Sequence, residues 1–301
     1  MRINKDLERR RTYLPRLPSP PSHIAEDTGS MTPNPSLTHA LALMLATSDP
    51  WEKATMARQL TVDWKAGCFS DPSISPENWP APAGRERPPL APPSAMAKRG
   101  LGSDAGRFAL LHAVAHIELN AIDLAIDMLG RFTCEVPAAE QADFIADWLS
   151  VADDEARHFT MVSDRLQEMG GSYGDLPAHD GLWMAAIRTQ EDFLGRLAIA
   201  PLVLEARGLD VTPPMIKGLT SAKDMKSAAI LQQIHDEEVG HVSIGAKWFR
   251  ATCSRNNVDP QETFSTKVEQ YFPGGLKRPF NTDARDKSGV PRDWYEGAAI
   301  S

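Results

Sequence analysis

Four long segments of the chain repeat apolar residues at the spacing of an α-helix, about 3.6 residues per turn. We predict helices over residues 104–129, 137–169, 181–207 and 223–253. The third contains Pro201, which we expect to kink it one turn before Glu205, and "RGLD" is expected to end it. Because no segment alternates apolar and polar residues as strands do, the pattern predicts an all-α four-helix bundle.

The segments on either side are expected to be additions to this bundle. Residues 36–99 are predicted to form a helical preamble followed by a strap rich in proline, which forbids regular helix. The bundle itself is assigned to residues 100–255. Residues 256–301 are predicted to form a C-terminal arm packed on the bundle, irregular from Tyr271 onward.

The first 35 residues are polar and rich in proline, and they lack the apolar core of a secretory signal. We expect this stretch to be disordered. Met31 directly precedes the first amphipathic segment, so the alternative is that translation starts there and the preceding residues extend the gene model. Mass spectrometry of the natively expressed protein distinguishes the two.

The apolar stripes of the four helices carry acids and histidines in the order E, ExxH, E, ExxH. These residues are Glu118, Glu155, His158, Glu205, Glu238 and His241. A Glu and a His three residues apart point from one helix face in nearly the same direction, so both can reach one metal ion. Burying carboxylates without partners is costly, and the stripes carry no Lys or Arg to pair with them. We therefore interpret the six as ligands of a carboxylate-bridged di-iron or di-manganese site.

The two halves of this set are spaced alike, with 87 residues from Glu118 to Glu205 and 83 from Glu155 to Glu238. The match predicts two helical hairpins related by a pseudo-twofold axis. The alternative for either ExxH alone is an ordinary contact on a solvated helix.

Three further residues are assigned to the surroundings of the ligands: His116, Asp154 and Asp236. A carboxylate that orients a ligand histidine is expected at Asp154 or Asp236. His116 lies about 200° around the helix from Glu118, so it is assigned to packing or to this outer layer instead of to the metal.

The composition limits which partners and which cellular compartment are expected. The net charge of −8 provides no general basic surface, so bulk nucleic acid is not an expected partner, although a local patch is compatible with it. Three scattered cysteines without a CxxC pair fit a reducing compartment. The sequence contains no uninterrupted run of about 18 apolar residues, so no membrane span is predicted and a cytoplasmic protein is expected.

Five stretches together carry a family resemblance: "HAVAHIELNAIDLAIDMLGRF", "WLSVADDEARHFTMVSDRLQEMGGSYGDLPAHDGLW", "PLVLEARGLDVTPPMI", "HDEEVGHVSIGAKWFR" and "RPFNTDARDKSG". Across residues 37–295 the chain resembles the ferritin-like family catalogued as domain of unknown function 455. The resemblance implies a ferritin-like bundle with a di-metal site at the six positions, and no assigned reaction. More distantly, the layout is similar to bacterial di-iron enzymes that hydroxylate an isopentenylated adenosine in tRNA.

These observations lead to an expected function. Two iron ions, or manganese or a mixed pair, are expected to use O₂ to hydroxylate or desaturate a small molecule or a modified nucleoside. Such an oxidoreductase needs an electron-donor protein. The alternatives are a ferroxidase or other iron- or peroxide-handling protein, and a non-enzymatic metal-binding scaffold.

Overall fold

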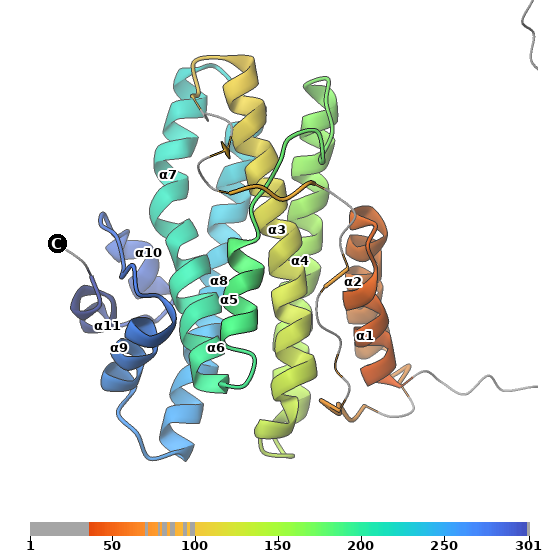
Figure 1. Cartoon of the computed structure of the whole chain (residues 1–301), viewed down its shortest axis with the longest axis vertical. Coiled ribbons are helices and arrows are strands. Elements are labelled where there is room, and N and C mark those ends of the chain that lie inside the picture. The colour runs from red at the N-terminus through yellow and green to blue at the C-terminus, as the bar shows by residue number, and fades with distance from the viewer. Residues whose placement is uncertain are drawn as a thin grey trace, which may run out of the picture. The chain divides into compact units, whose positions relative to one another are not determined.

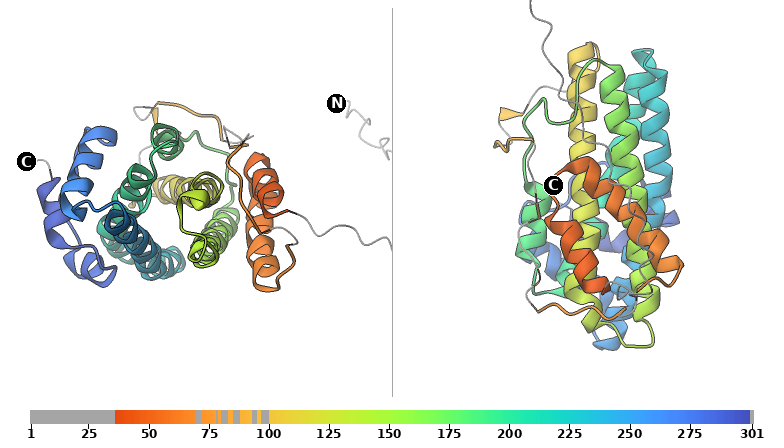
Figure 2. Two further views of the ribbon diagram at one scale, coloured as in Figure 1. Left: turned by 90° about the horizontal axis from the view of Figure 1, so that it is seen from below. Right: turned by 90° about the vertical axis from the view of Figure 1, so that its right-hand side faces the viewer.

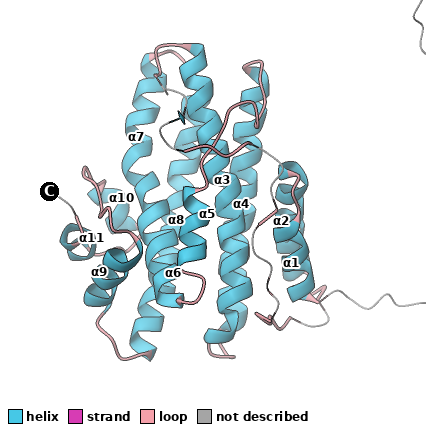
Figure 3. Cartoon of the chain, viewed as in Figure 1, coloured by secondary structure: helices cyan, strands magenta, loops and turns pink. Residues whose placement is uncertain are grey.

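The computed structural model describes residues 36–69, 72–77, 79, 83–84, 88–92, 95–96 and 100–299. These residues form helices joined by loops, and across them no strand is formed beyond two isolated bridges (Figure 3). The prediction of an all-α fold is confirmed. The expectations for the first 35 residues, including the start at Met31, lie outside the described residues.

Four long helices make up the bundle and lie side by side (Figure 1). They are α3 (Asp104–Phe132), α4 (Gln141–Glu168), α7 (Ala206–Ser221) and α8 (Met225–Arg255). The main contacts are of α3 with α4 and of α7 with α8, which gives two hairpins. The end-on view in Figure 2 shows the long helices around a common interior. The bounds of α3, α4 and α8 agree with the prediction to within four residues at each end.

The third predicted helix differs from the structure. Residues 181–207 are divided into α5 (Gly181–Arg188), α6 (Phe193–Ile199) and a π-helical segment, η3 (Ala200–Glu205), which continues into α7. Pro201 has no N–H to donate to the preceding turn, so this turn widens where the kink was expected. "RGLD" does not end the helix, because Leu209 is fully buried and its packing outweighs the helix cost of Gly208.

A close approach fixes the π-helical segment against α8. A Cβ atom added at Gly245 would lie 2.3 Å from Cβ of Pro201. Only a residue without a side chain lets the two backbones come this near. Glu205, at the end of η3, is thereby held beside the α8 face that carries Glu238 and His241.

The N-terminal helices α1 (Leu37–Ala46) and α2 (Pro50–Lys65) cover one side of the bundle, mainly against α3 and α4 (Figure 1). Lys53 of α2 is buried and forms a 2.5 Å ion pair with Asp123 of α3. Its ammonium group also donates to the carbonyl oxygens of Leu45 and Gly84. This buried pair ties the preamble and part of the strap to the bundle.

The C-terminal arm is more regular than expected. It contains α9 (Pro260–Tyr271), α10 (Thr282–Lys287) and α11 (Arg292–Gly297), which lie on the side of α8 away from α1 and α2 (Figure 2). The rings of Phe264 and Trp294 pack against Phe249 of α8. The arm therefore shares the hydrophobic core of the bundle.

One helical stretch, Asp104–Glu135, is long and apolar enough to cross a membrane. Within the bundle, however, 89% of its most apolar window is buried. Packing against α4 and the preamble accounts for this apolar composition.

Candidate metal centre

The six sequence-predicted ligands come from four elements that face the bundle interior. Glu118 projects from α3, Glu155 and His158 from α4, Glu205 from the end of η3, and Glu238 and His241 from α8. Glu155 and His158 are fully buried, Glu118 and His241 are 3% exposed and Glu238 is 9% exposed. Four of them, Glu118, Glu155, His158 and Glu238, each offer a ligand atom within 4.8 Å of one another.

Glu155 lies between the two histidines. Its Oε2 is 3.5 Å from Nδ1 of His158, and its Oε1 is 3.0 Å from Nδ1 of His241. The two imidazole centroids are 5.9 Å apart. One carboxylate therefore reaches toward both halves of the centre.

Each histidine has a second carboxylate on the same side of its ring. His158 Nδ1 lies 3.2 Å from Oε2 of Glu118, and His241 Nδ1 lies 3.6 Å from Oε2 of Glu238. Glu205 completes the second half, since its electrostatic neighbours are Glu238, Glu155 and His241. The two ExxH motifs thus present Nδ1 inward in an approximately twofold arrangement.

The outer ring nitrogens are held by carboxylates that cross between the helices. Nε2 of His158 on α4 donates to Glu237 of α8 at 2.6 Å. Nε2 of His241 on α8 donates to Asp154 of α4 at 3.2 Å. Each of these acids directly precedes the glutamate of its own ExxH motif, so the crossing repeats the twofold pattern.

This role was predicted for Asp154 or Asp236. The structure brings Asp154 to it, whereas the side chain of Asp236 is 66% exposed and accepts a hydrogen bond from Gln232. The second carboxylate that orients a histidine is Glu237. The signal was present in the sequence: Glu237 stands four residues before His241, as Asp154 stands four before His158.

Arg157 joins the two outer carboxylates and was not foreseen. Its Nη2 lies 2.5 Å from Asp154 and 2.9 Å from Glu237, and its Nη1 donates to Glu237 at 3.2 Å. Arg157, Asp154 and Glu237 are about 30% exposed at the side chain. A partly solvated polar layer therefore covers the buried ligands on this side.

His116 is not brought to the centre. Its Nδ1 lies 2.9 Å from the hydroxyl of Tyr173, and its Nε2 lies 3.1 Å from the carbonyl oxygen of His179. The side chain therefore ties α3 to the loop after α4. This position follows from the large angle that separates residues 116 and 118 around the helix.

The charges in the centre depend on one another. Burial raises the pKa of Glu118 and of Glu205 well above the ordinary range, and neighbouring carboxylates add to both shifts. Burial would also raise the pKa of Glu155, but its close contacts with the positively charged His158 and His241 outweigh burial and lower that pKa. In the metal-free protein, protons balance the clustered carboxylates.

The histidines show the complementary shift. Burial alone would lower the pKa of His158, yet its contacts with Glu118 and Glu155 raise it to about 11. The pKa of His241 is raised well above its ordinary value by Asp154, Glu155 and Glu238, against the effect of burial. The protons on His158 and His241 supply positive charge where a bound metal ion would otherwise supply it.

Five of the buried atoms left without hydrogen bonds lie in this centre and fit a metal. Among the described residues they include both carboxylate oxygens of Glu155, Oε2 of Glu205, Oε2 of Glu238 and Nδ1 of His241. An unsatisfied buried polar atom is costly, and all five belong to carboxylates or an imidazole, the donors that iron and manganese accept. This buried Glu/His group can hold a metal ion.

The family described as "Protein of unknown function (DUF455)" matches the chain over residues 46–296. The chain belongs to the DUF455 family. A relative from Haemophilus influenzae, described as "Uncharacterized protein", is 40% identical over 217 residues, which cover 70% of this chain and 75% of the relative. No solved structure matches. The DUF455 match contains all six inward residues and both crossing carboxylates.

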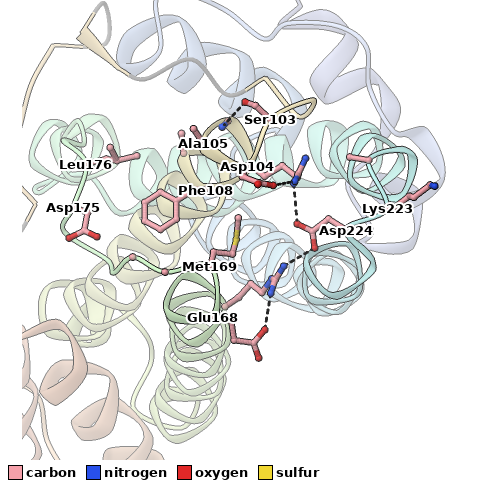
Figure 4. A pocket seen from close by; sticks show the side chains of 17 residues that line it. Ser103, Asp104, Ala105, Phe108, Glu168, Met169, Asp175, Leu176, Lys223 and Asp224 are labelled. Atoms are coloured by element: carbon pink, nitrogen blue, oxygen red, sulfur yellow. Dashed lines mark hydrogen bonds and ion pairs between the residues drawn. The ribbon is translucent and has the colours of Figure 1, made fainter.

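A cavity of about 850 Å³ lies elsewhere in this DUF455 protein. It is found where α3 begins and α4 ends (Figure 4). Asp224 there pairs with both Arg107 and Arg165, at 3.5 and 3.0 Å. At a rise of 1.5 Å per residue, Arg107 lies about 16 Å along α3 from Glu118. None of the cavities described is lined by the six inward residues.

Proposed function

We propose that this protein is a non-haem di-iron oxidoreductase that uses O₂ to hydroxylate or desaturate an organic substrate. The observation that carries the proposal is the twofold set of two ExxH motifs and two single glutamates, each histidine being fixed by a carboxylate from the opposite helix. A four-helix bundle that carries this ligand set is the arrangement found in carboxylate-bridged di-iron and di-manganese proteins.

The residues divide into two groups that would each hold one ion. Glu118 and His158 form the first group, and Glu205 and His241 form the second, while Glu238 has a ligand atom within 4.8 Å of those of Glu118 and His158 and also lies beside His241. Glu155, whose two oxygens approach different histidines, would serve both ions. Iron is preferred, with manganese or a mixed pair as the variants that the same donors accept.

Iron bound here would supply redox chemistry with O₂, which no side chain provides. The chain's own contribution is positioning. Glu237 and Asp154 keep the Nε2 protons of the two histidines outward, which leaves the Nδ1 lone pairs free for metal. Burial of the carboxylates excludes bulk water. An electron-donor protein is a required partner, and a small molecule or a modified nucleoside is the proposed substrate.

A second candidate is oxidation of iron or removal of peroxide, without an organic substrate. It is favoured by one observation: the cavities of about 850, 270, 220 and 70 Å³ are all lined by residues other than the six inward ones. An oxygenase requires space for a substrate beside the metals, whereas iron oxidation requires only a path for the ion and for O₂.

The test begins with metal content. The full-length protein is purified anaerobically, loaded with Fe(II) and analysed for bound metal, and its reaction with O₂ is followed by absorption and Mössbauer spectroscopy. We expect about two irons per chain and their oxidation by O₂. Metal content near zero, or zinc alone with no O₂ reaction, contradicts the proposal. Catalytic turnover of Fe(II) or peroxide without substrate oxidation supports the second candidate.

A further inference from the structure

A separate cavity lies between the π-helical segment, the first turns of α7 and the C-terminal arm. Its volume is about 220 Å³. Val203 and Leu204 line it from η3, and Phe272, Leu276 and Phe280 line it from the arm. The wall is therefore mainly aliphatic and aromatic, and it is built by segments about 70 residues apart in the chain.

Arg285 brings a charge to this apolar wall. The side chain is 2% exposed, and its guanidinium group packs on the rings of Phe280 and Tyr295, 5.0 and 4.7 Å from their centroids. Nε and Nη2 donate to the two oxygens of Asp210 at 2.9 and 2.7 Å. Nη1 is buried and has no hydrogen-bond partner among the described residues. Two nitrogens are thus satisfied and the third is left over.

An unused donor on a buried cation is costly, and it is the kind of group that a ligand satisfies. A hydrogen-bond acceptor attached to an apolar body meets both requirements of the cavity.

The charges that line the cavity favour an anion. Arg207, Lys277 and Arg285 face a single acid, Asp210. Both oxygens of Asp210 are already engaged, Oδ1 by Arg285 and the backbone N–H of Asn281, and Oδ2 by Arg285 and, at 3.4 Å, by Nη1 of Arg207. The cavity therefore keeps positive charge that its own residues do not neutralise.

We propose that this cavity binds a small apolar molecule that carries one carboxylate. The carboxylate accepts a hydrogen bond from Nη1 of Arg285, and the apolar body lies against Leu204, Leu276 and Phe280. A cavity of about 150 Å³ holds a benzene ring, so this one accepts a molecule of about the size of benzoate.

The site is distinct from the metal centre. The cavity contacts η3 through Val203 and Leu204, whereas Glu205, the next residue, belongs to the inward cluster. Binding is therefore expected in both the metal-free and the metal-loaded protein. The inference stands even where the proposed oxidoreductase activity fails.

The experiment compares benzoate with the neutral benzyl alcohol by titration calorimetry on the full chain. We expect benzoate to bind about tenfold or more tightly, because the alcohol lacks the charge that a charge-assisted hydrogen bond needs. Equal affinities for the two compounds, or no benzoate binding at about 10 mM, overturn the proposal.

A matched pair of variants locates the site. Gly274 lines the cavity, and a Cβ added there meets no atom within 4 Å, so Gly274→Trp obstructs the cavity without a backbone clash. Gly297 on α11 is equally open and does not line the cavity, so Gly297→Trp is the control. We expect the first variant to weaken benzoate binding about tenfold or more and the control to leave it unchanged. Wild-type affinity in Gly274→Trp refutes the location.

A third variant tests the donor itself. Arg285→Lys keeps a positive charge beside Asp210 but loses the guanidinium fork. We expect it to lose the preference for benzoate over benzyl alcohol, and a retained preference argues against Nη1 as the donor. Circular dichroism verifies its fold. If Arg285→Lys does not fold, the comparison of the two compounds and the two glycine variants decide the proposal.

Discussion

Glu237 of α8 accepts a hydrogen bond from Nε2 of His158 on α4 at 2.6 Å. The contact joins α8 to α4 at the partly exposed side of the ligands, and its counterpart, in which His241 of α8 donates to Asp154 of α4, runs in the opposite direction. Each ExxH motif therefore depends on the other helix for the orientation of its histidine. A metal held by one motif is coupled to the position of both helices.

Removing either crossing acceptor should weaken metal binding. Glu237→Gln and Asp154→Asn keep the size of the side chain but lose the negative charge that orients the imidazole. Outer carboxylates of this kind contribute about 10- to 100-fold to metal affinity. We expect losses in that range, measured by competition with a chelator of known affinity.

Asp236→Asn is the matched control for these two variants. Asp236 adjoins Glu237 in sequence, but its side chain is 66% exposed and contacts no inward histidine. Metal affinity should stay at the wild-type value. A loss in Asp236→Asn as large as in Glu237→Gln would show that surface charge, and not orientation of His158, controls binding.

Replacing the central carboxylate should empty the site. Glu155→Ala removes the group whose two oxygens face His158 and His241. We expect metal content to fall from about two ions per chain to near zero, because neither half keeps its shared ligand. Elemental analysis after anaerobic loading with Fe(II) measures this.

Glu238→Ala should have the same effect, and Glu168→Ala should have none. Glu168 lies on the same helix as Glu155, but its side chain is 49% exposed and pairs with Arg165 and Lys226. Normal metal content in both Glu155→Ala and Glu238→Ala would refute the ligand assignment.

The inward acids were predictable because burial makes an acid on an apolar stripe exceptional. Glu118 and Glu155 stand out against their neighbours without any knowledge of the fold. Choosing between Asp236 and Glu237 requires more. The two differ by about 100° around α8, and the direction in which α4 lies is a property of the packed bundle.

The π-helical segment was beyond a sequence-based prediction for a related reason. Pro201 indicates a disturbance of the helix, but not its form. The form is set by contact with Gly245, which lies 44 residues later and meets Pro201 only after the hairpins assemble. The missed continuation through Gly208 likewise depends on the burial of Leu209 between packed helices.

Two alanine substitutions in α8 should act in opposite directions. A Cβ at position 245 meets Pro201 at 2.3 Å, so Gly245→Ala forces the π-helical segment and α8 apart. Overpacking of this kind costs about 1–3 kcal/mol of the free energy of unfolding. Gly240→Ala meets no atom within 4 Å and should stabilise the protein by about 0.5–1 kcal/mol, because alanine favours the helix.

Urea denaturation of the metal-free proteins measures both effects. Gly245→Ala should also lower metal affinity, because it displaces the segment that ends at Glu205. Gly240→Ala should not. Equal stabilities of the two variants would mean that α8 and η3 separate at no cost, contrary to the contact described.

The stability of the metal-free protein should fall as the pH rises above neutrality. The pKa of His158 is raised to about 11 in the folded protein by Glu118 and Glu155, against the effect of burial, from about 6.5 when unfolded. Its stabilising contribution is complete below pH 6.5 and is lost as the pH rises toward 11. We expect a melting temperature that decreases from pH 7 to pH 9.

Metal should reverse this trend, because it displaces the same protons and its binding therefore strengthens as the pH rises. The difference in melting temperature between the loaded and the metal-free protein should grow from pH 7 to pH 9. The variant His158→Gln removes the titrating group, so its metal-free form should show a weaker dependence on pH than wild type. A metal-free melting temperature that rises over this range in wild type would mean that His158 is neutral when folded, and that Glu118 and Glu155 are not balanced by its proton.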